Sequence, residues 1–113
     1  MTSSLDQYRR HAFDHGFHTA ECNADAGSES YDHLQEAFAT LVRDGRRNEL
    51  FGLYDDADPS VQCWAAAHTL EVDEARALAK LEQLEKSEVP HVSMDAEYTI
   101  KEWKSGELRF LPS

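Results

Sequence analysis

The stretch DPSVQCWAAAHTL, residues 58–70, decides the fold of this chain. Asp58 can cap a helix, and Pro59 suits the first helical position because the N–H that proline lacks would have no partner there. At about 100° per residue, the remaining apolar residues fall on two opposite faces. One face holds Val61, Trp64, Ala65 and His68, and the other holds Cys63, Ala66, Ala67 and Leu70. A helix that is apolar on two sides is buried between neighbours, so this stretch predicts a central helix with partners on both flanks.

Helical periodicity continues on both sides of this stretch and predicts about six helices joined by short connections. A turn is expected at 23–27 and a loop at 87–92. Asp73 and Ser93 are expected to cap the last two helices, and Gly16, in the middle of the first, indicates a close helix crossing. The expected helices cover residues 4–24, 28–44, 46–54, 59–70, 74–86 and 93–104.

The chain is expected to form one all-α domain over residues 1–113. No segment shows sustained strand alternation, and no low-complexity linker divides the sequence. In the second half, acidic corners alternate with alanine-rich or leucine-rich helices. This cadence favours a short HEAT-like α-α superhelix, in which helical units stack on their neighbours, with a compact bundle as the alternative. Leu108, Phe110 and Leu111 give the C-terminal tail apolar side chains with which to dock.

Acidic residues dominate the charge, with 22 Asp and Glu against 11 Lys and Arg and a net charge of −11. Residues 55–97 hold 11 of the acids and only 3 bases. A field of this sign repels nucleic acid and anionic lipid and attracts a basic partner, although acidity also serves plain solubility. No apolar run is long enough to span a membrane, and no signal peptide is expected. Cys22 and Cys63 make no disulfide framework, so a cytoplasmic location is expected.

Three motifs carry a resemblance to a known family. They read DPxVxxWAAxHxL over residues 58–70, AxxxLExL over 77–84 and AxxxxKEWxxGxL over 96–108. With them the chain resembles a family of small bacterial proteins of unknown function that fold as a short all-α superhelix of the armadillo/HEAT kind. The resemblance implies this fold, and it implies neither enzymatic activity nor a cofactor. Some proteins of this general kind act as immunity proteins beside polymorphic toxins, which suggests the same role here.

Histidines on the first predicted helix form the sharpest candidate for chemistry. Four potential metal ligands recur at intervals of four, three and four residues, namely His11, His15, His18 and Cys22. They share one edge of the helix within roughly 60°, and such side chains can bind Zn²⁺. One helix spreads them over ~16 Å, however, so His33 would have to complete the site, and its place opposite the apolar stripe of the second helix argues against this. The sequence favours ordinary boundary histidines, with a metal site as the alternative.

Other residues that look catalytic are better explained by packing. His68 is expected to be a hydrogen-bonded core histidine, and Cys63 a small buried apolar side chain. The chain has no serine hydrolase motif, no glycine-rich phosphate loop and no calcium loop. Arg46 and Arg47 form a single basic pair, which is too little for nucleic acid. The sequence therefore predicts no enzyme activity and no cofactor.

Acidic residues gather at two corners of the expected fold, 55–58 and 73–74. If stacked units align these corners along one edge, the two groups form one patch. Asp58 and Asp73 are expected to act as helix caps, which leaves the other carboxylates to a partner. Tyr98, on the polar side of the last helix, is the expected aromatic anchor. The predicted partner-binding residues are Asp55, Asp56, Glu82, Glu85, Glu97 and Tyr98.

Charge, the lack of catalytic motifs and the family resemblance together favour a non-enzymatic protein-binding module. The first hypothesis is an immunity protein whose acidic surface neutralises a basic toxin, such as a nuclease. The second hypothesis is a metal-binding protein that uses the histidine edge of the first helix. The third is an accessory subunit of a stable complex.

Overall fold

The computed structural model describes residues 3–20 and 24–106, and within these ranges it describes the side chains outside 18–28. Every regular element in this part of the chain is a helix. The elements are α1 (Ser4–Ala20), α2 (Ala24–Arg43), the 3₁₀ helix η1 (Arg47–Asp55), α3 (Pro59–His68), α4 (Glu74–Glu85) and α5 (Pro90–Ser105). The prediction of an all-α fold with about six helices is confirmed. The expected docking of Leu108, Phe110 and Leu111 falls outside the described residues.

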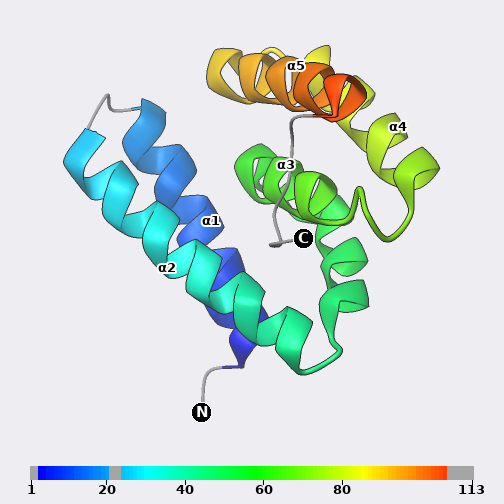
Figure 1. Cartoon of the computed structure of the whole chain (residues 1–113). Coiled ribbons are helices and arrows are strands. Elements are labelled where there is room, and N and C mark those ends of the chain that lie inside the picture. Colours follow the sequence, from blue (N-terminus) through cyan, green and yellow to red (C-terminus); the bar gives the residue numbers. More distant parts are fainter. Residues whose placement is uncertain (1–2, 21–23, 107–113) are drawn as a thin grey trace.

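Two helix pairs flank α3 (Figure 1). The pair α1/α2 lies on one side, the pair α4/α5 lies on the other, and α3 contacts α1, η1, α4 and α5. Most contacts join elements that are neighbours in the chain, as predicted for stacked helical units. Principal dimensions of 36 × 31 × 27 Å and a radius of gyration of 13.1 Å are those of a compact globule.

The central helix α3 forms as its sequence predicts. Asp58 has extended backbone angles, and its carboxylate accepts hydrogen bonds from the backbone N–H groups of Ser60 and Val61 at 2.9 and 3.1 Å. Pro59 occupies the first turn. The two apolar faces are buried as expected, and Trp64 is the exception because it is only half-buried. Trp64 is thus the large apolar side chain of α3 that reaches the surface.

His68 is a core residue, as predicted. Its side chain is fully buried, and its Nδ1 lies 2.6 Å from the hydroxyl of Tyr8 in a hydrogen bond between α3 and α1. The ring of Phe38 from α2 stacks on the imidazole at 4.0 Å. Cys63 is buried as well, and burial raises the pKa of its thiol to about 12. A thiol with such a pKa stays protonated and is a poor nucleophile, which agrees with a packing role.

The close helix crossing expected at Gly16 joins α1 to α3. Gly16 is buried, and a Cβ atom built on it would overlap the side chain of Ser60 in the first turn of α3. Only a residue without a side chain lets these two helices approach to this distance.

Replacing Gly16 with alanine is expected to lower the free energy of unfolding by about 2 kcal/mol, because overpacking outweighs the better helix propensity of alanine. Urea unfolding of the variant measures this. Ser60→Gly in the same chain should recover much of the loss, and the single Ser60→Gly variant completes a double-mutant cycle. Strict additivity of the two substitutions would show that they do not meet.

Two expected helix boundaries are wrong. Helix α2 begins at Ala24, so the turn expected at 23–27 does not extend over 24–27. Alanine has a high helix propensity, and an Asp in the first turn interacts favourably with the helix dipole. Together they allow a helix to form through Gly27, which costs about 1 kcal/mol relative to alanine. Helix α5 begins at Pro90 rather than at Ser93, because proline is preorganised for the first helical position. Ser93 instead donates a hydrogen bond to the carbonyl oxygen of Glu85 and ties α5 to the end of α4.

Candidate binding groove

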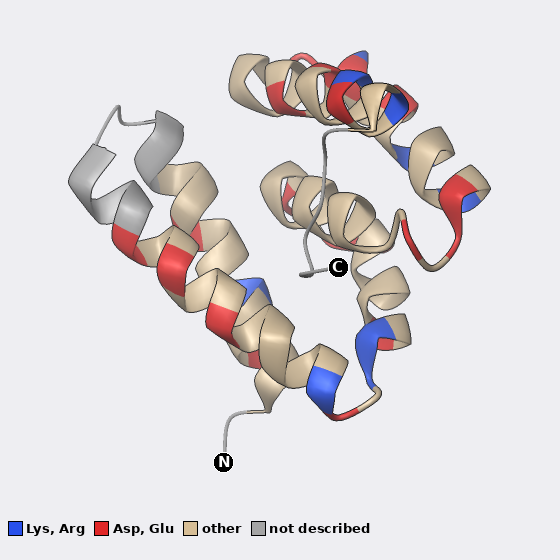
Figure 2. Cartoon of the chain, in the orientation of Figure 1, with Lys and Arg blue, Asp and Glu red and all other residues tan. Residues whose placement is uncertain are grey.

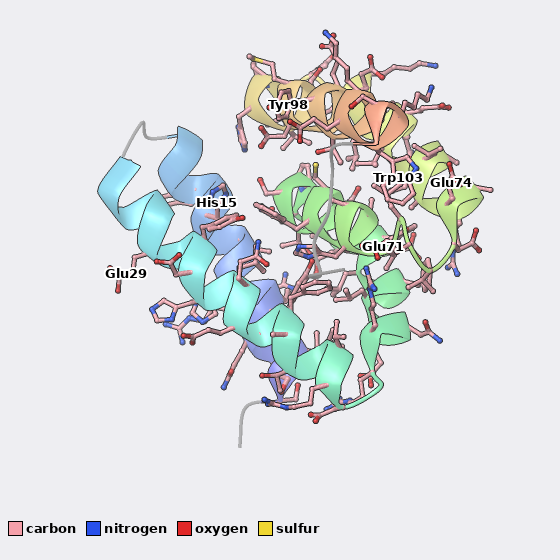
Figure 3. The ribbon with its side chains drawn as sticks, viewed as in Figure 1. His15, Glu29, Glu71, Glu74, Tyr98 and Trp103 are labelled. Carbon is pink, nitrogen blue, oxygen red and sulfur yellow. The ribbon has the colours of Figure 1, made fainter. Side chains whose placement is uncertain are left out.

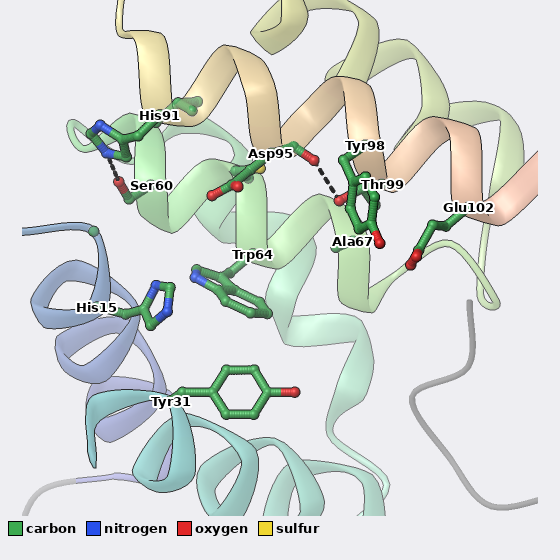
Figure 4. A pocket seen from close by; sticks show the side chains of 13 residues that line it. His15, Tyr31, Ser60, Trp64, Ala67, His91, Asp95, Tyr98, Thr99 and Glu102 are labelled. Carbon is green, nitrogen blue, oxygen red and sulfur yellow. Dashed lines mark hydrogen bonds between the residues drawn. The ribbon is translucent and has the colours of Figure 1, made fainter. Parts of the chain in front are cut away.

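A groove of about 360 Å³ opens between the α1/α2 pair and α5 (Figure 4). Helices α1 and α2 supply one wall, α3 supplies the floor and α5 supplies the other wall. Figure 3 shows His15 and Tyr98 on the two walls, one from α1 and one from α5. The volume falls in the range of about 300–1,000 Å³ that is typical of ligand pockets.

Three rings from three helices meet at the bottom of the groove. Trp64 of α3 contacts His15 of α1 edge to face, with ring centroids 5.3 Å apart. Tyr31 of α2 lies 5.8 Å from the same indole, and its ring is tilted by 56°. Tyr31 is 42% exposed, so the cluster presents aromatic surface to a ligand. The half-burial of Trp64 follows from this position.

The α5 wall is a polar stripe. Asp95, Tyr98, Thr99 and Glu102 are spaced at i, i+3, i+4 and i+7, and therefore share one face of the helix. The hydroxyl of Thr99 donates a 2.7 Å hydrogen bond to the Asp95 carbonyl oxygen in the preceding turn. Tyr98 is 62% exposed at the rim. A different face of α5, with Ala96 and Ile100, is buried in the core.

Asp95 is a carboxylate of this wall that lies near two histidines, His15 and His91. Loss of surrounding water raises the pKa of its carboxyl group, and the nearby His15 and His91 lower it in part. His91 itself is held in place by a 3.1 Å hydrogen bond between its Nε2 and the Oγ of Ser60 (Figure 4). Asp95 is nevertheless an exposed residue, so its carboxylate is accessible to a ligand in the groove.

The groove carries negative charge without a permanent positive counter-charge. Its described lining includes two carboxylates, Asp95 and Glu102, and neither lysine nor arginine. Figure 2 shows acidic residues along α2, both acidic and basic residues on α5, and basic residues at the junction of α2 with η1. A cation is the ligand that this distribution of charge would attract.

The predicted partner-binding residues occupy several parts of the surface. Glu82 and Glu85 on α4 and Glu97 on α5 are exposed, as is Asp55 at the end of η1. Of the predicted set, Tyr98 alone is among the described residues that line the groove.

Asp56 is engaged within the fold, which corrects its interpretation as a surface group for a partner. Its carboxylate accepts a 2.5 Å hydrogen bond from Nε of Arg9 and a 3.0 Å hydrogen bond from the backbone N–H of Asp58. Burial alone would raise the pKa of Asp56, but these two donors lower it below its usual value. Asp56 thus joins α1 to the turn that starts α3.

The two acidic corners lie at opposite ends of α3, so the alignment along one edge that a single patch would need is not found. The corner at 55–58 precedes α3 and the corner at 73–74 comes after it. A helix of 10 residues separates them by about 15 Å. In stacked helical units only alternate corners share an edge, and these two are consecutive. Glu74 accordingly meets the far end of α5, where its carboxylate accepts a hydrogen bond from the indole N–H of Trp103 at 3.1 Å.

The candidate metal ligands diverge where their side chains are described. His11 stacks on His33 with ring centroids 5.0 Å apart, whereas His15 turns to Trp64 and the groove. His33 therefore lies against this edge of α1, contrary to the expectation from its place opposite the apolar stripe of α2. Among the residues that the structure describes, no group of three or more His, Cys, Asp or Glu side chains is arranged to hold a metal ion. The side chain of His18 and the whole of Cys22 fall outside the described residues.

The groove could not be predicted from the sequence, because its walls come from segments that are far apart in the chain. A signal was present in α5, where the polar and aromatic stripe of Asp95, Tyr98 and Glu102 recurs at helical spacing outside the core face. A second signal was Tyr31, a large aromatic side chain at one end of the apolar stripe of α2. Neither pattern shows which helix stands opposite.

Comparison of the chain with protein-family models, with curated proteins and with solved structures finds no match. In the described part of the chain, no helix combines the length and the apolar composition needed to cross a bilayer. Function is therefore inferred from the side chains of this protein itself.

Proposed function

We propose that this protein is a non-enzymatic binding module for a basic protein, and that it acts as an immunity protein that neutralises a toxin such as a nuclease. The groove carries this proposal, because it presents carboxylates above an aromatic floor and its described lining contains no lysine or arginine. The family resemblance points to the same role.

The net charge of −11 supports fast capture of such a partner. Long-range attraction steers a basic protein toward an acidic face and raises the association rate about 10-fold to 1,000-fold at low salt. A nuclease must carry positive charge where it binds phosphate, so an acidic partner competes for the surface that the nuclease needs. Neutralisation then requires only that the active site be covered.

The proposed contact surface combines the groove with exposed carboxylates on other parts of the surface. Tyr98 at the rim is the proposed anchor, since large aromatic side chains carry much of the energy of protein interfaces. The exposed carboxylates of Asp55, Glu82, Glu85 and Glu97, which do not line the groove, remain proposed steering charges. Asp56 is left out because Arg9 and the turn before α3 already use its carboxylate.

The test begins with the untagged protein coupled to a support and exposed to lysate of the native host. Bound proteins are cross-linked, identified and expressed alone. We expect a strongly basic partner that is toxic to cells, and we expect co-expression of this chain to restore growth. Its dissociation constant should rise about tenfold or more between ~50 and ~300 mM NaCl, mainly through slower association.

Tyr98→Ala tests the proposed anchor in this experiment. It should weaken binding and protection while leaving the melting temperature almost unchanged, because the residue is 62% exposed. A partner that is acidic, or a basic partner that is harmless when expressed alone, would overturn the toxin-neutralising role. A harmless partner that stays bound at high salt would instead identify an accessory subunit.

A further inference from the structure

The groove combines two features that together recognise a cation. Figure 4 shows Asp95 projecting from α5 into the space above Trp64, with Tyr31 on the far side of the indole. Aromatic faces attract a cation through their quadrupole, and a carboxylate pairs with it directly. A ligand that enters between α5 and the aromatic floor meets both groups at once.

A guanidinium group fits this arrangement better than an ammonium group does. It is planar, so it can stack on an aromatic ring while its N–H donors point to a carboxylate. It is also more weakly hydrated, and so it loses less on entering a partly enclosed groove. We propose, on the basis of the function proposed above, that the groove binds an arginine side chain of the basic partner, stacked on Trp64 and paired with Asp95.

The remainder of the α5 wall extends this recognition. Glu102 stands seven residues beyond Asp95, about 10 Å further along the helix, and places a second carboxylate at the other end of the groove. Tyr98 and Thr99 lie between the two carboxylates. Tyr98, at the rim, would cover the aliphatic part of an arginine side chain and keep water from the ion pair.

The experiment uses the full chain and a small probe, so it does not depend on a partner. The two tryptophan indole N–H signals are recorded by NMR at pH 8 and assigned with Trp103→Phe. N-acetyl-arginine methylamide is then titrated against its uncharged isostere, N-acetyl-citrulline methylamide. We expect the arginine probe to shift the Trp64 signal in a saturable way, with a dissociation constant on the order of 10 mM. The citrulline probe should leave it unmoved.

Matched variants locate the site. Asp95→Asn should weaken binding of the arginine probe about fivefold, and Asp32→Asn should not, because Asp32 is an exposed residue of α2 outside the groove. Glu102→Gln, titrated in the same way, tests the second carboxylate on the groove wall. The spectrum of each variant reports directly whether it is folded.

Three results would overturn the inference: no shift of the Trp64 signal, an equal response to citrulline, or full binding by Asp95→Asn. Any of these leaves the proposed function standing if the chain still captures and neutralises a basic toxin, since the contact would then lie elsewhere on the acidic surface. Conversely, a bound arginine probe without any toxin protection removes the immunity role and keeps the arginine site.

Discussion

Lowering the pH from 6.5 to 4 is expected to reduce the free energy of unfolding by about 3 kcal/mol through His68 alone. Burial and the nearby Arg47 lower the pKa of His68 to about 3, whereas an unfolded histidine titrates near 6.5. Below pH 6.5 the unfolded chain therefore binds the proton that the folded chain refuses. The contribution of His68 to the free energy of unfolding is therefore fully present above pH 6.5, and it is lost progressively down to about pH 3. Urea unfolding at pH 7, 6, 5 and 4 measures this slope.

The control is His68→Asn, which keeps an acceptor near Tyr8 but does not titrate. It should be less stable at pH 7, because it loses the ring that stacks on Phe38. Its stability should nevertheless change much less between pH 6.5 and 4. His11, whose pKa is lowered by burial and by His33, adds a smaller effect of the same sign that both chains share. Equal slopes in the two chains would contradict the role given to His68.

Arg47→Ala is expected to destabilise the protein by about 3 kcal/mol. The Nε of Arg47 donates a 2.9 Å hydrogen bond to the carbonyl oxygen of His68, at the end of α3, and its guanidinium lies over the ring of Phe38. A terminal nitrogen of the same group is 3.6 Å from Glu71. Removing the side chain leaves a buried carbonyl without its donor and separates η1 from α3. Chemical unfolding at pH 7 measures the loss.

The neighbouring Arg46 is the matched control. It pairs with Glu49 in the same turn at the surface, so Arg46→Ala should change stability by no more than about 0.5 kcal/mol. Arg47→Lys should remain well below wild type, because an ammonium cannot reproduce the fork of donors. Arg47→Ala should also flatten the acid-induced loss of stability, since Arg47 helps to lower the pKa of His68. Equal effects at the two arginines would show that Arg47 is not a buried link.

Arg46 and Arg47 are neighbours in the chain but have different roles in the structure. From the sequence, Arg46 and Arg47 were a basic dipeptide with no assigned role. In the structure one of them is a surface charge, whereas the other holds the end of the central helix. Arg9 does the same at the other end of α3 through Asp56. Arg9 and Arg47 thus make contacts that hold the ends of α3. Neither of them lines the groove, whose described charged residues include the carboxylates Asp95 and Glu102.

The sequence by itself determined the helices, the central place of α3 and the packing roles of His68 and Cys63. These features depend on patterns only a few residues long. An aspartate cap followed by proline starts a helix wherever it stands, and apolar residues on two faces require neighbours on both sides. Gly16 likewise indicated a close helix crossing, because a glycine within a helix lowers stability unless its lack of a side chain is needed.

Tertiary structure alone decided which side chains share a site. His15, Tyr31, Trp64 and Asp95 come from four helices and meet only because α3 is held between two helix pairs. Nothing in the local sequence shows that Asp56 turns inward to Arg9, which lies 47 residues earlier in the chain. Helical periodicity specifies the face on which a residue stands, but the neighbour that this face meets depends on the crossing of whole helices, which is decided by packing across the entire core.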